Sequence, residues 1–115
     1  MSIAETYSQG DSIFIVTKLY EDGNLYDVMK TYPKKQMPEP ISKVVFRKIL
    51  IGLLGLKQRL VIHRDIKLGN ILIRNELTEV NVCIADFGIA AMLIDHEDHR
   101  RFSMGTEGFT APEVL

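Results

Sequence analysis

Three short blocks of this sequence carry residue types that could do chemistry, and they follow one another along the chain. The first block is His63-Arg64-Asp65-Ile66-Lys67-Leu68-Gly69-Asn70, the second is Asp86-Phe87-Gly88, and the third is Ala111-Pro112-Glu113. The first two supply carboxylate and amide oxygens, which suit a hard divalent cation such as Mg²⁺. One such block alone would be weak evidence, whereas three in this order indicate a common catalytic arrangement.

The first block resembles the H-R-D-x-x-x-x-N catalytic loop of the eukaryotic protein kinases. The second and third resemble the D-F-G and A-P-E motifs of the same family. The resemblance runs from Ile13 to Leu115, and residues 1–12 carry no recognisable pattern. It implies transfer of the γ-phosphate of ATP to a hydroxyl group of a protein substrate, with Mg²⁺ as the cofactor.

The resemblance assigns roles to four polar side chains. Asp65 matches the catalytic aspartate, which orients the substrate hydroxyl and accepts its proton. Lys67 matches the lysine that contacts the transferred phosphate in serine/threonine kinases. Asn70 and Asp86 match the two Mg²⁺ ligands and thereby belong to ATP binding.

The adenine side of an ATP site is expected at the end of residues 13–17 and just after them. Thr17 resembles the gatekeeper beside the adenine pocket, and Leu19 and Tyr20 resemble the hinge residues whose backbone binds adenine. Leu72 resembles the residue beneath the ring. Alternatively, Lys18 could be the lysine of a V-A-I-K strand, but it lies 47 residues before the catalytic aspartate, closer than the family pattern allows.

A regulatory phosphate is expected in the activation segment, which runs from the D-F-G to the A-P-E motif. Arg64 resembles the arginine that pairs with a phosphorylated residue in many kinases. Ser103 follows two arginines and a phenylalanine and is the best candidate for modification by an upstream kinase. An unmodified loop serine fits the sequence equally well.

Thr106 resembles the threonine that braces the catalytic aspartate and lysine in serine/threonine kinases. Together with Lys67 it argues against a tyrosine kinase. The sequence then departs from the common family pattern at Glu107-Gly108-Phe109, which leaves the peptide specificity open. The cluster Asp95-His96-Glu97-Asp98-His99 is interpreted as a solvated insertion rather than a metal site, because no further histidine or cysteine converges on it.

The composition excludes several classes of partner. The chain has 14 basic and 15 acidic residues and a net charge of −1, which gives no electrostatic case for nucleic acid or an anionic membrane. The apolar stretch at 41–56 is too interrupted by charge to span a bilayer. The single cysteine, Cys83, excludes an internal disulfide and is expected to be buried. We therefore expect an intracellular, cytoplasmic protein.

Local patterns predict an α+β fold. We expect a buried strand at 13–17, a short capped helix at 24–29, an exposed loop at 32–40 and a long helix from residue 41, whose apolar residues continue at helical spacing to residue 60. A short strand at 61–62 and a strand pair at 71–73 and 80–84 follow. By the resemblance to the kinases, His63 and Phe87 are expected to be internal packing residues that link the catalytic loop to the D-F-G segment.

By resemblance, residues 1–115 form one partial kinase domain with most of the N-lobe absent. Residues 13–19 match its last N-lobe strand and hinge, and residues 20–115 match the first part of its C-lobe. The chain contains no G-x-G-x-x-G loop and no lysine and glutamate placed to clamp the nucleotide. Activity is therefore expected only within a complete domain. The alternative is a catalytically inactive, kinase-derived binding module or decoy, and a small-molecule kinase is disfavoured by Lys67 and the A-P-E motif.

Overall fold

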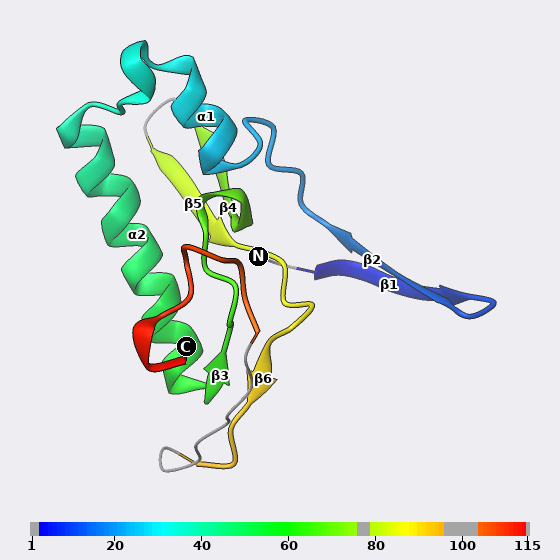
Figure 1. The fold of residues 1–115 in the computed structure, drawn as a ribbon. Helices are drawn as coiled ribbons and strands as arrows, with labels where there is room; N and C mark the ends of the chain where they lie inside the picture. The colour runs from blue at the N-terminus through cyan, green and yellow to red at the C-terminus, as the bar shows by residue number, and fades with distance from the viewer. Residues whose placement is uncertain (1–2, 76–78, 96–103, 115) are drawn as a thin grey trace.

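The computed structural model describes residues 3–75, 79–95 and 104–114, and its mixture of helices and strands confirms the predicted α+β class (Figure 1). The described part contains two α-helices and three two-stranded antiparallel sheets. The elements are, in order, β1 (Ile3–Gln9), β2 (Ser12–Thr17), α1 (Leu25–Thr31), α2 (Glu39–Gln58), β3 (Val61–Ile62), β4 (Ile71–Asn75), β5 (Val80–Ile84) and β6 (Ala91–Met92). Short 3₁₀ turns lie at Pro33–Lys35, Leu68–Asn70 and Pro112–Val114.

Strands β1 and β2 form a hairpin. The sequence pattern predicted the second strand but not the first, because no pattern was recognised before residue 13. Gln9 pairs with Ser12, so the turn consists of Gly10 and Asp11. Gly10 has a φ of +58°, a value that glycine adopts at little steric cost. Glycine at the first position of a two-residue loop is typical of a type II′ hairpin turn, and this was the available sequence signal.

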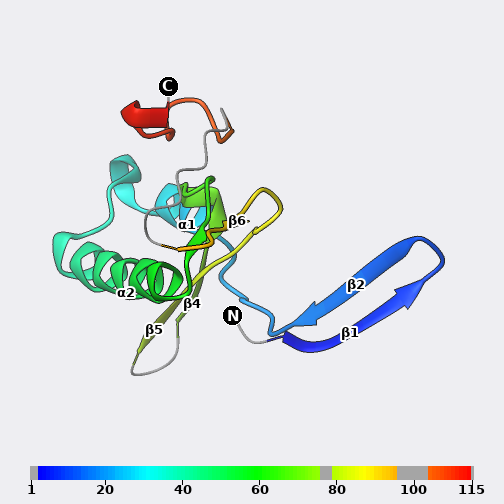
Figure 2. The ribbon, with the colours of Figure 1, turned by 90° about the horizontal axis from the view of Figure 1, so that it is seen from below.

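The prediction that residues 13–17 form a buried strand is wrong. The strand exists as β2, but Ile13 is 75% exposed and Ile15 is 59% exposed. Among the described residues β2 pairs only with β1, and the hairpin extends away from both helices (Figures 1 and 2). Since no second layer covers the hairpin in the described residues, a strongly apolar sequence does not produce burial here.

Both helices begin close to the predicted positions. The side chain of Asn24 accepts a hydrogen bond from the backbone N–H of Asp27 at 3.0 Å and so caps α1, as predicted. The predicted loop at 32–40 contains a 3₁₀ turn and the start of α2, which begins at Glu39 rather than at residue 41. Leu60 was assigned to the same helix, but it lies beyond the helix end with a φ of +57°.

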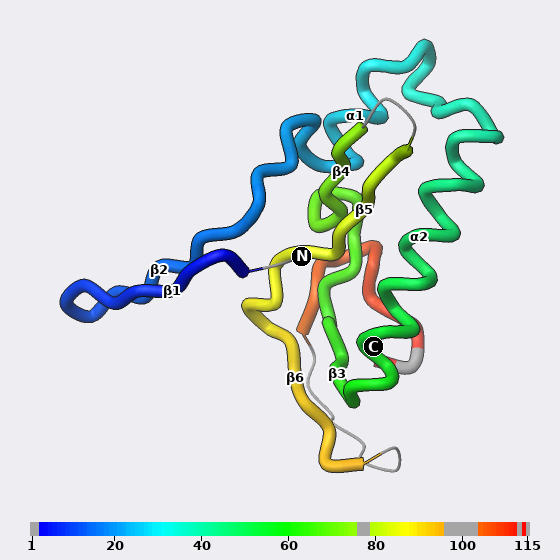
Figure 3. Tube along the Cα trace, turned by 180° about the vertical axis from the view of Figure 1, so that it is seen from behind, coloured from blue at the N-terminus to red at the C-terminus, as the bar shows by residue number. Residues whose placement is uncertain are grey.

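The core lies where the β4–β5 pair packs against α2 (Figure 3). The predicted strand pair is confirmed, with Leu72 opposite Cys83, and Cys83 is buried as expected. The buried apolar core consists of Leu25, Val45, Ile71, Ile73 and Ile84. β4 follows the first sequence block directly and β3 precedes it, so the block is a loop held between two strands. Neither helix in the described residues is long and apolar enough to cross a lipid bilayer.

Candidate active site

His63 connects the first sequence block to the second. It is 3% exposed, as expected for a core histidine. Its Nε2 donates to the carbonyl oxygen of Ala85 at 2.9 Å, and its Nδ1 accepts from the backbone N–H of Asp65 at 3.3 Å. The ring meets Phe87 edge-on with centroids 4.8 Å apart, which confirms the predicted packing. The imidazole therefore positions the loop and has no nitrogen left for a substrate.

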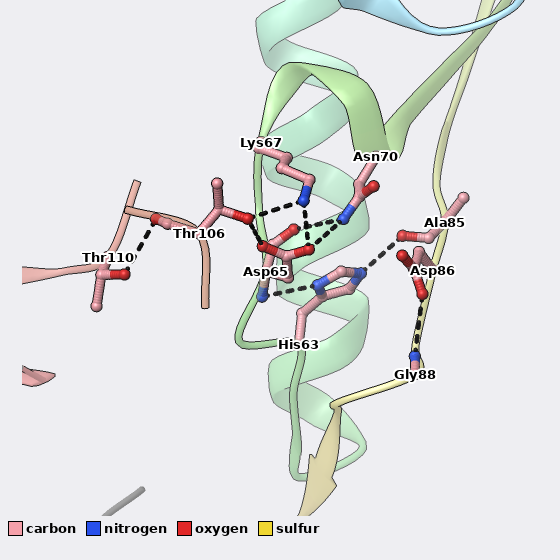
Figure 4. A network of polar contacts seen from close by, with 9 residues as sticks. All are labelled: His63, Asp65, Lys67, Asn70, Ala85, Asp86, Gly88, Thr106 and Thr110. Carbon is pink, nitrogen blue, oxygen red and sulfur yellow. Dashed lines mark hydrogen bonds and ion pairs between the residues drawn. The ribbon is translucent and has the colours of Figure 1, made fainter. Parts of the chain in front are cut away.

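Asp65 lies at the centre of a polar network (Figure 4). Its Oδ1 accepts from the hydroxyl of Thr106 at 2.5 Å. Its Oδ2 accepts from the amide nitrogen of Asn70 at 2.9 Å and pairs with Lys67 Nζ at 2.8 Å. Lys67 also donates to the Thr106 hydroxyl at 2.8 Å. The structure thus brings together the four residues from two distant parts of the sequence.

This network determines the charge of Asp65. The hydrogen bond from Lys67 contributes most, followed by that from Thr106, and together with Asn70 they lower the carboxyl pKa from 3.8 to about 2. Partial burial acts in the opposite direction and is outweighed. The carboxylate is therefore ionised at neutral pH and acts as a hydrogen-bond acceptor.

Asn70 and Asp86 lie on adjoining segments, because the N–H of Ala85 donates to the Asn70 carbonyl at 2.9 Å. The Asn70 amide nitrogen is engaged by Asp65, and its amide oxygen points away from that residue (Figure 4). Asp86 is exposed, has a φ of +63° and accepts from the N–H of Gly88 at 3.2 Å. An amide oxygen and a carboxylate fit Mg²⁺ by their chemistry. The described residues hold no cluster of three or more histidine, cysteine or acidic side chains suited to a metal.

The residues predicted for the adenine side lie on the segment between the hairpin and α1 and on β4. Thr17 and Tyr20 are half-buried, whereas Leu19 is 73% exposed. Burial raises the pKa of the Tyr20 phenol, and the Cys83 thiol raises it further. Leu72 is half-buried and forms an isolated β-bridge with Asn24. The bridge ties this segment to the strand that follows the catalytic loop.

The predicted regulatory residues are only partly within the described structure. The guanidinium of Arg64 donates to the carbonyl oxygens of Ile89 and Ala90, the second at 3.4 Å. Arg64 therefore contacts the backbone just after the D-F-G motif. Ser103 lies outside the described residues, and so do residues 96–99 of the acidic and histidine-rich cluster.

Sequence reasoning noted Gly105 only as the neighbour of Thr106, and it assigned no role to Gly105 or Thr110, which both contact this site. Gly105 lies against the Arg64 carbonyl, and the hydroxyl of Thr110 donates to the carbonyl of Thr106 at 3.2 Å. Neither residue type stands out in a loop sequence. The only available signal was their position beside Thr106, which the family resemblance had already marked.

The network in Figure 4 joins the catalytic-loop block to Thr106 and, through His63, to the segment of Asp86. The sequence model of the protein kinase domain matches residues 1–115. The chain belongs to the protein kinase family. This confirms the resemblance to the protein kinases that the three sequence blocks showed.

Three relatives illustrate the similarity. The chain is 36% identical to Myosin-IIIa of Homo sapiens over 108 residues, which is 92% of this chain and 6% of the relative. It is 35% identical to Serine/threonine-protein kinase PLK2 of Mus musculus and 30% identical to Serine/threonine-protein kinase PLK4 of Drosophila grimshawi. Each of these two matches covers 109 residues, or 95% of this chain, and 15% and 14% of the respective relative. The chain thus spans only a small part of these relatives.

Proposed function

We propose that this chain forms the catalytic-loop part of a protein serine/threonine kinase, which transfers the γ-phosphate of ATP to a serine or threonine hydroxyl of a protein. In this proposal residues 13–19 are the last N-lobe strand and hinge, and residues 20–115 are the first part of the C-lobe. The observation that carries the proposal is the contact of Thr106 with both Asp65 and Lys67.

Asp65 is proposed to orient the acceptor hydroxyl. A carboxylate offers about four acceptor sites, and the hydrogen bonds and ion pair from Thr106, Asn70 and Lys67 use three. The remaining site can accept the hydrogen bond of a substrate hydroxyl. Because its pKa is about 2, Asp65 is a weak base. It therefore receives the proton only as the new phosphorus–oxygen bond forms, when that hydroxyl has become strongly acidic.

Lys67 is proposed to neutralise the transferred phosphoryl group. An ammonium group has three N–H donors, and two are directed at Asp65 and Thr106. The third can bind a phosphate oxygen. The contacts with Asp65 and Thr106 fix the position of the charge, so that little reorganisation is required during transfer.

Asn70 and Asp86 are proposed to hold Mg²⁺ through the amide oxygen and the carboxylate. The ion, when bound, supplies neutralisation of charge on the ATP phosphates. Thr17, Leu19, Tyr20 and Leu72 are proposed to form the adenine side. Since these 115 residues contain neither a glycine-rich loop nor a clamping lysine–glutamate pair, we propose that transfer requires a complete domain.

Arg64 and Ser103 are proposed to regulate this activity, with an upstream kinase phosphorylating Ser103 and Arg64 binding the phosphate. Binding would require Arg64 to exchange its contacts with the carbonyls of Ile89 and Ala90. The setting proposed for the whole protein is intracellular and cytoplasmic, with a protein substrate and without nucleic-acid or membrane partners.

The test uses the natural polypeptide that carries this sequence, isolated by immunoprecipitation and weighed by intact-mass analysis. It is incubated with radiolabelled ATP, Mg²⁺ and a general protein acceptor. Asp65→Asn and Asp86→Asn are expected to lower transfer by about 10²- to 10⁴-fold. Glu39→Gln, which changes an exposed carboxylate paired with Lys43 on α2, should leave transfer unchanged.

Phosphoserine or phosphothreonine in the acceptor supports the proposal. Phosphotyrosine, or transfer that survives both site substitutions, contradicts it. An unaltered polypeptide that transfers no phosphate favours the alternative of a catalytically inactive binding module.

A further inference from the structure

The backbone at Thr106 is closed into a tight turn. The N–H of Phe109 donates to the Thr106 carbonyl at 3.0 Å. Gly108, the third residue of the turn, has a φ of +80°, the value that a type II turn requires at that position. The turn thus directs the Thr106 carbonyl inward, while the Thr106 side chain reaches Asp65.

The same carbonyl accepts a second hydrogen bond, from the side chain of Thr110. The Thr110 hydroxyl lies 3.2 Å from the Thr106 carbonyl oxygen. It also lies 3.1 Å from the point where a Cβ on Gly105 would be. The half-buried Thr110 therefore occupies the space left by the missing side chain of Gly105.

The position of the Thr106 hydroxyl depends on this backbone. Threonine is branched at Cβ and has few accessible χ1 values, so fixing its backbone largely fixes its hydroxyl oxygen. That oxygen is 2.5 Å from Asp65 Oδ1 and 2.8 Å from Lys67 Nζ. A small rotation of the 106–109 turn would lengthen both contacts.

We infer that Thr110 is a positioning residue, which acts through the Thr106 carbonyl to hold the Thr106 hydroxyl on Asp65 and Lys67. The inference rests on the proposed phosphotransfer function and adds to it a residue that touches neither the substrate nor the nucleotide. Loss of the Thr110 hydroxyl should slow the transfer step and not weaken ATP binding, because in the proposed function Asp65 and Lys67 act on the reacting groups and not on the adenine side.

The experiment compares Thr110→Val with Thr110→Ser in the natural polypeptide. Valine keeps the shape and removes the hydroxyl, whereas serine keeps the hydroxyl. Thr110→Val should lower kcat by about two- to tenfold, the factor that one hydrogen bond is worth, with the KM for ATP unchanged. Thr110→Ser should restore kcat. Thr31→Val is the matched control, since the Thr31 hydroxyl makes the same kind of bond to the Val28 carbonyl, at 2.8 Å, on α1.

A double-mutant cycle with Thr106→Val tests the route of the effect. Thr106→Val should retain measurable transfer, because Lys67 and Asn70 still hold Asp65. Adding Thr110→Val to it should cause no further loss in kcat. The inference would be overturned if Thr110→Val lowered kcat equally in the wild-type protein and in Thr106→Val. It would also be overturned if Thr110→Val raised the KM for ATP without lowering kcat, or had no effect.

Amide hydrogen exchange at Phe109 provides a readout that does not depend on activity. Thr110→Val should accelerate exchange of this amide, and Thr110→Ser and Thr31→Val should not. An inactive unaltered polypeptide would contradict the proposed function alone. If the polypeptide were inactive and Thr110→Val left exchange of the Phe109 amide unchanged, the inference about Thr110 would be overturned as well. Faster exchange of this amide would show that Thr110 does hold the 106–109 turn.

Discussion

Gly105 lies so close to the carbonyl oxygen of Arg64 that a Cβ on the glycine would be only 2.9 Å away from it. The two residues are 41 positions apart, one in the catalytic loop and the other just before Thr106. Gly105 also has a φ of +133°, which residues with a side chain rarely adopt. Both its conformation and the close approach therefore require glycine, and they bring Thr106 within reach of Asp65.

We predict that Gly105→Ala lowers kcat by about tenfold or more, since the clash and the backbone strain together cost on the order of 1–3 kcal/mol. The added methyl group would move Thr106 away from the catalytic loop. Gly10→Ala is the control: Gly10 also has a positive φ, +58°, but no atom lies within 4 Å of its added Cβ. It should cost about 1 kcal/mol of stability and leave kcat unchanged. Equal kcat values for the two variants would contradict this prediction.

His63→Phe is predicted to destabilise the fold. Phenylalanine retains a buried ring but leaves the Ala85 carbonyl and the Asp65 N–H without their present partner. Each such loss costs about 1–3 kcal/mol, so the free energy of unfolding in urea should fall by about 2–6 kcal/mol. Ser42→Ala, which removes a half-buried hydrogen bond to Met37, should cost about 1 kcal/mol. If His63→Phe and Ser42→Ala lowered the free energy of unfolding by similar amounts, this would argue against a role of His63 in linking the Asp65 N–H to the Ala85 carbonyl.

The network around Asp65 predicts a pH-dependent contribution to stability. The folded-state pKa of Asp65 is lowered, chiefly by Lys67, to about 2 from an ordinary 3.8. Its contribution is therefore fully present above about pH 4 and is lost as the pH falls toward 2. In metal-free urea unfolding, the difference between the wild-type protein and Asp65→Asn should shrink over this range. If the difference in the free energy of unfolding between the wild-type protein and Asp65→Asn stayed constant from pH 5 to 2.5, the network around Asp65 would be ruled out as its source.

The core beneath the loop predicts a graded response to truncation of Ile73, which is 1% exposed. Ile73→Val should lower the free energy of unfolding by about 0.5–1.5 kcal/mol, and Ile73→Ala by about 2–5 kcal/mol. The larger loss reflects the cavity that would remain in the core cluster of Ile73 with Leu25, Val45 and Ile84. Denaturant unfolding measures both values, and an alanine variant no less stable than the valine variant would show that this site is not tightly packed.

Local sequence was sufficient to predict several elements of the fold. The Asn24 cap, the helical spacing from residue 41 and the strand pair at 71–73 and 80–84 were each predicted from short segments. Such features depend on interactions between residues a few positions apart, which the sequence displays directly. The catalytic-loop block was recognised for the same reason, because its residues are contiguous.

The tertiary structure decided which distant atoms meet and which surfaces are covered. Strand β2 is exposed although residues 13–17 are typical of a buried strand, because burial depends on what packs against a strand and not on its own composition. The contact of Thr106 with Asp65 depends on how the chain returns to the loop after 41 residues. The sequence thus determined the chemical groups and their local conformation, and only the folded chain determined the distances at which they act.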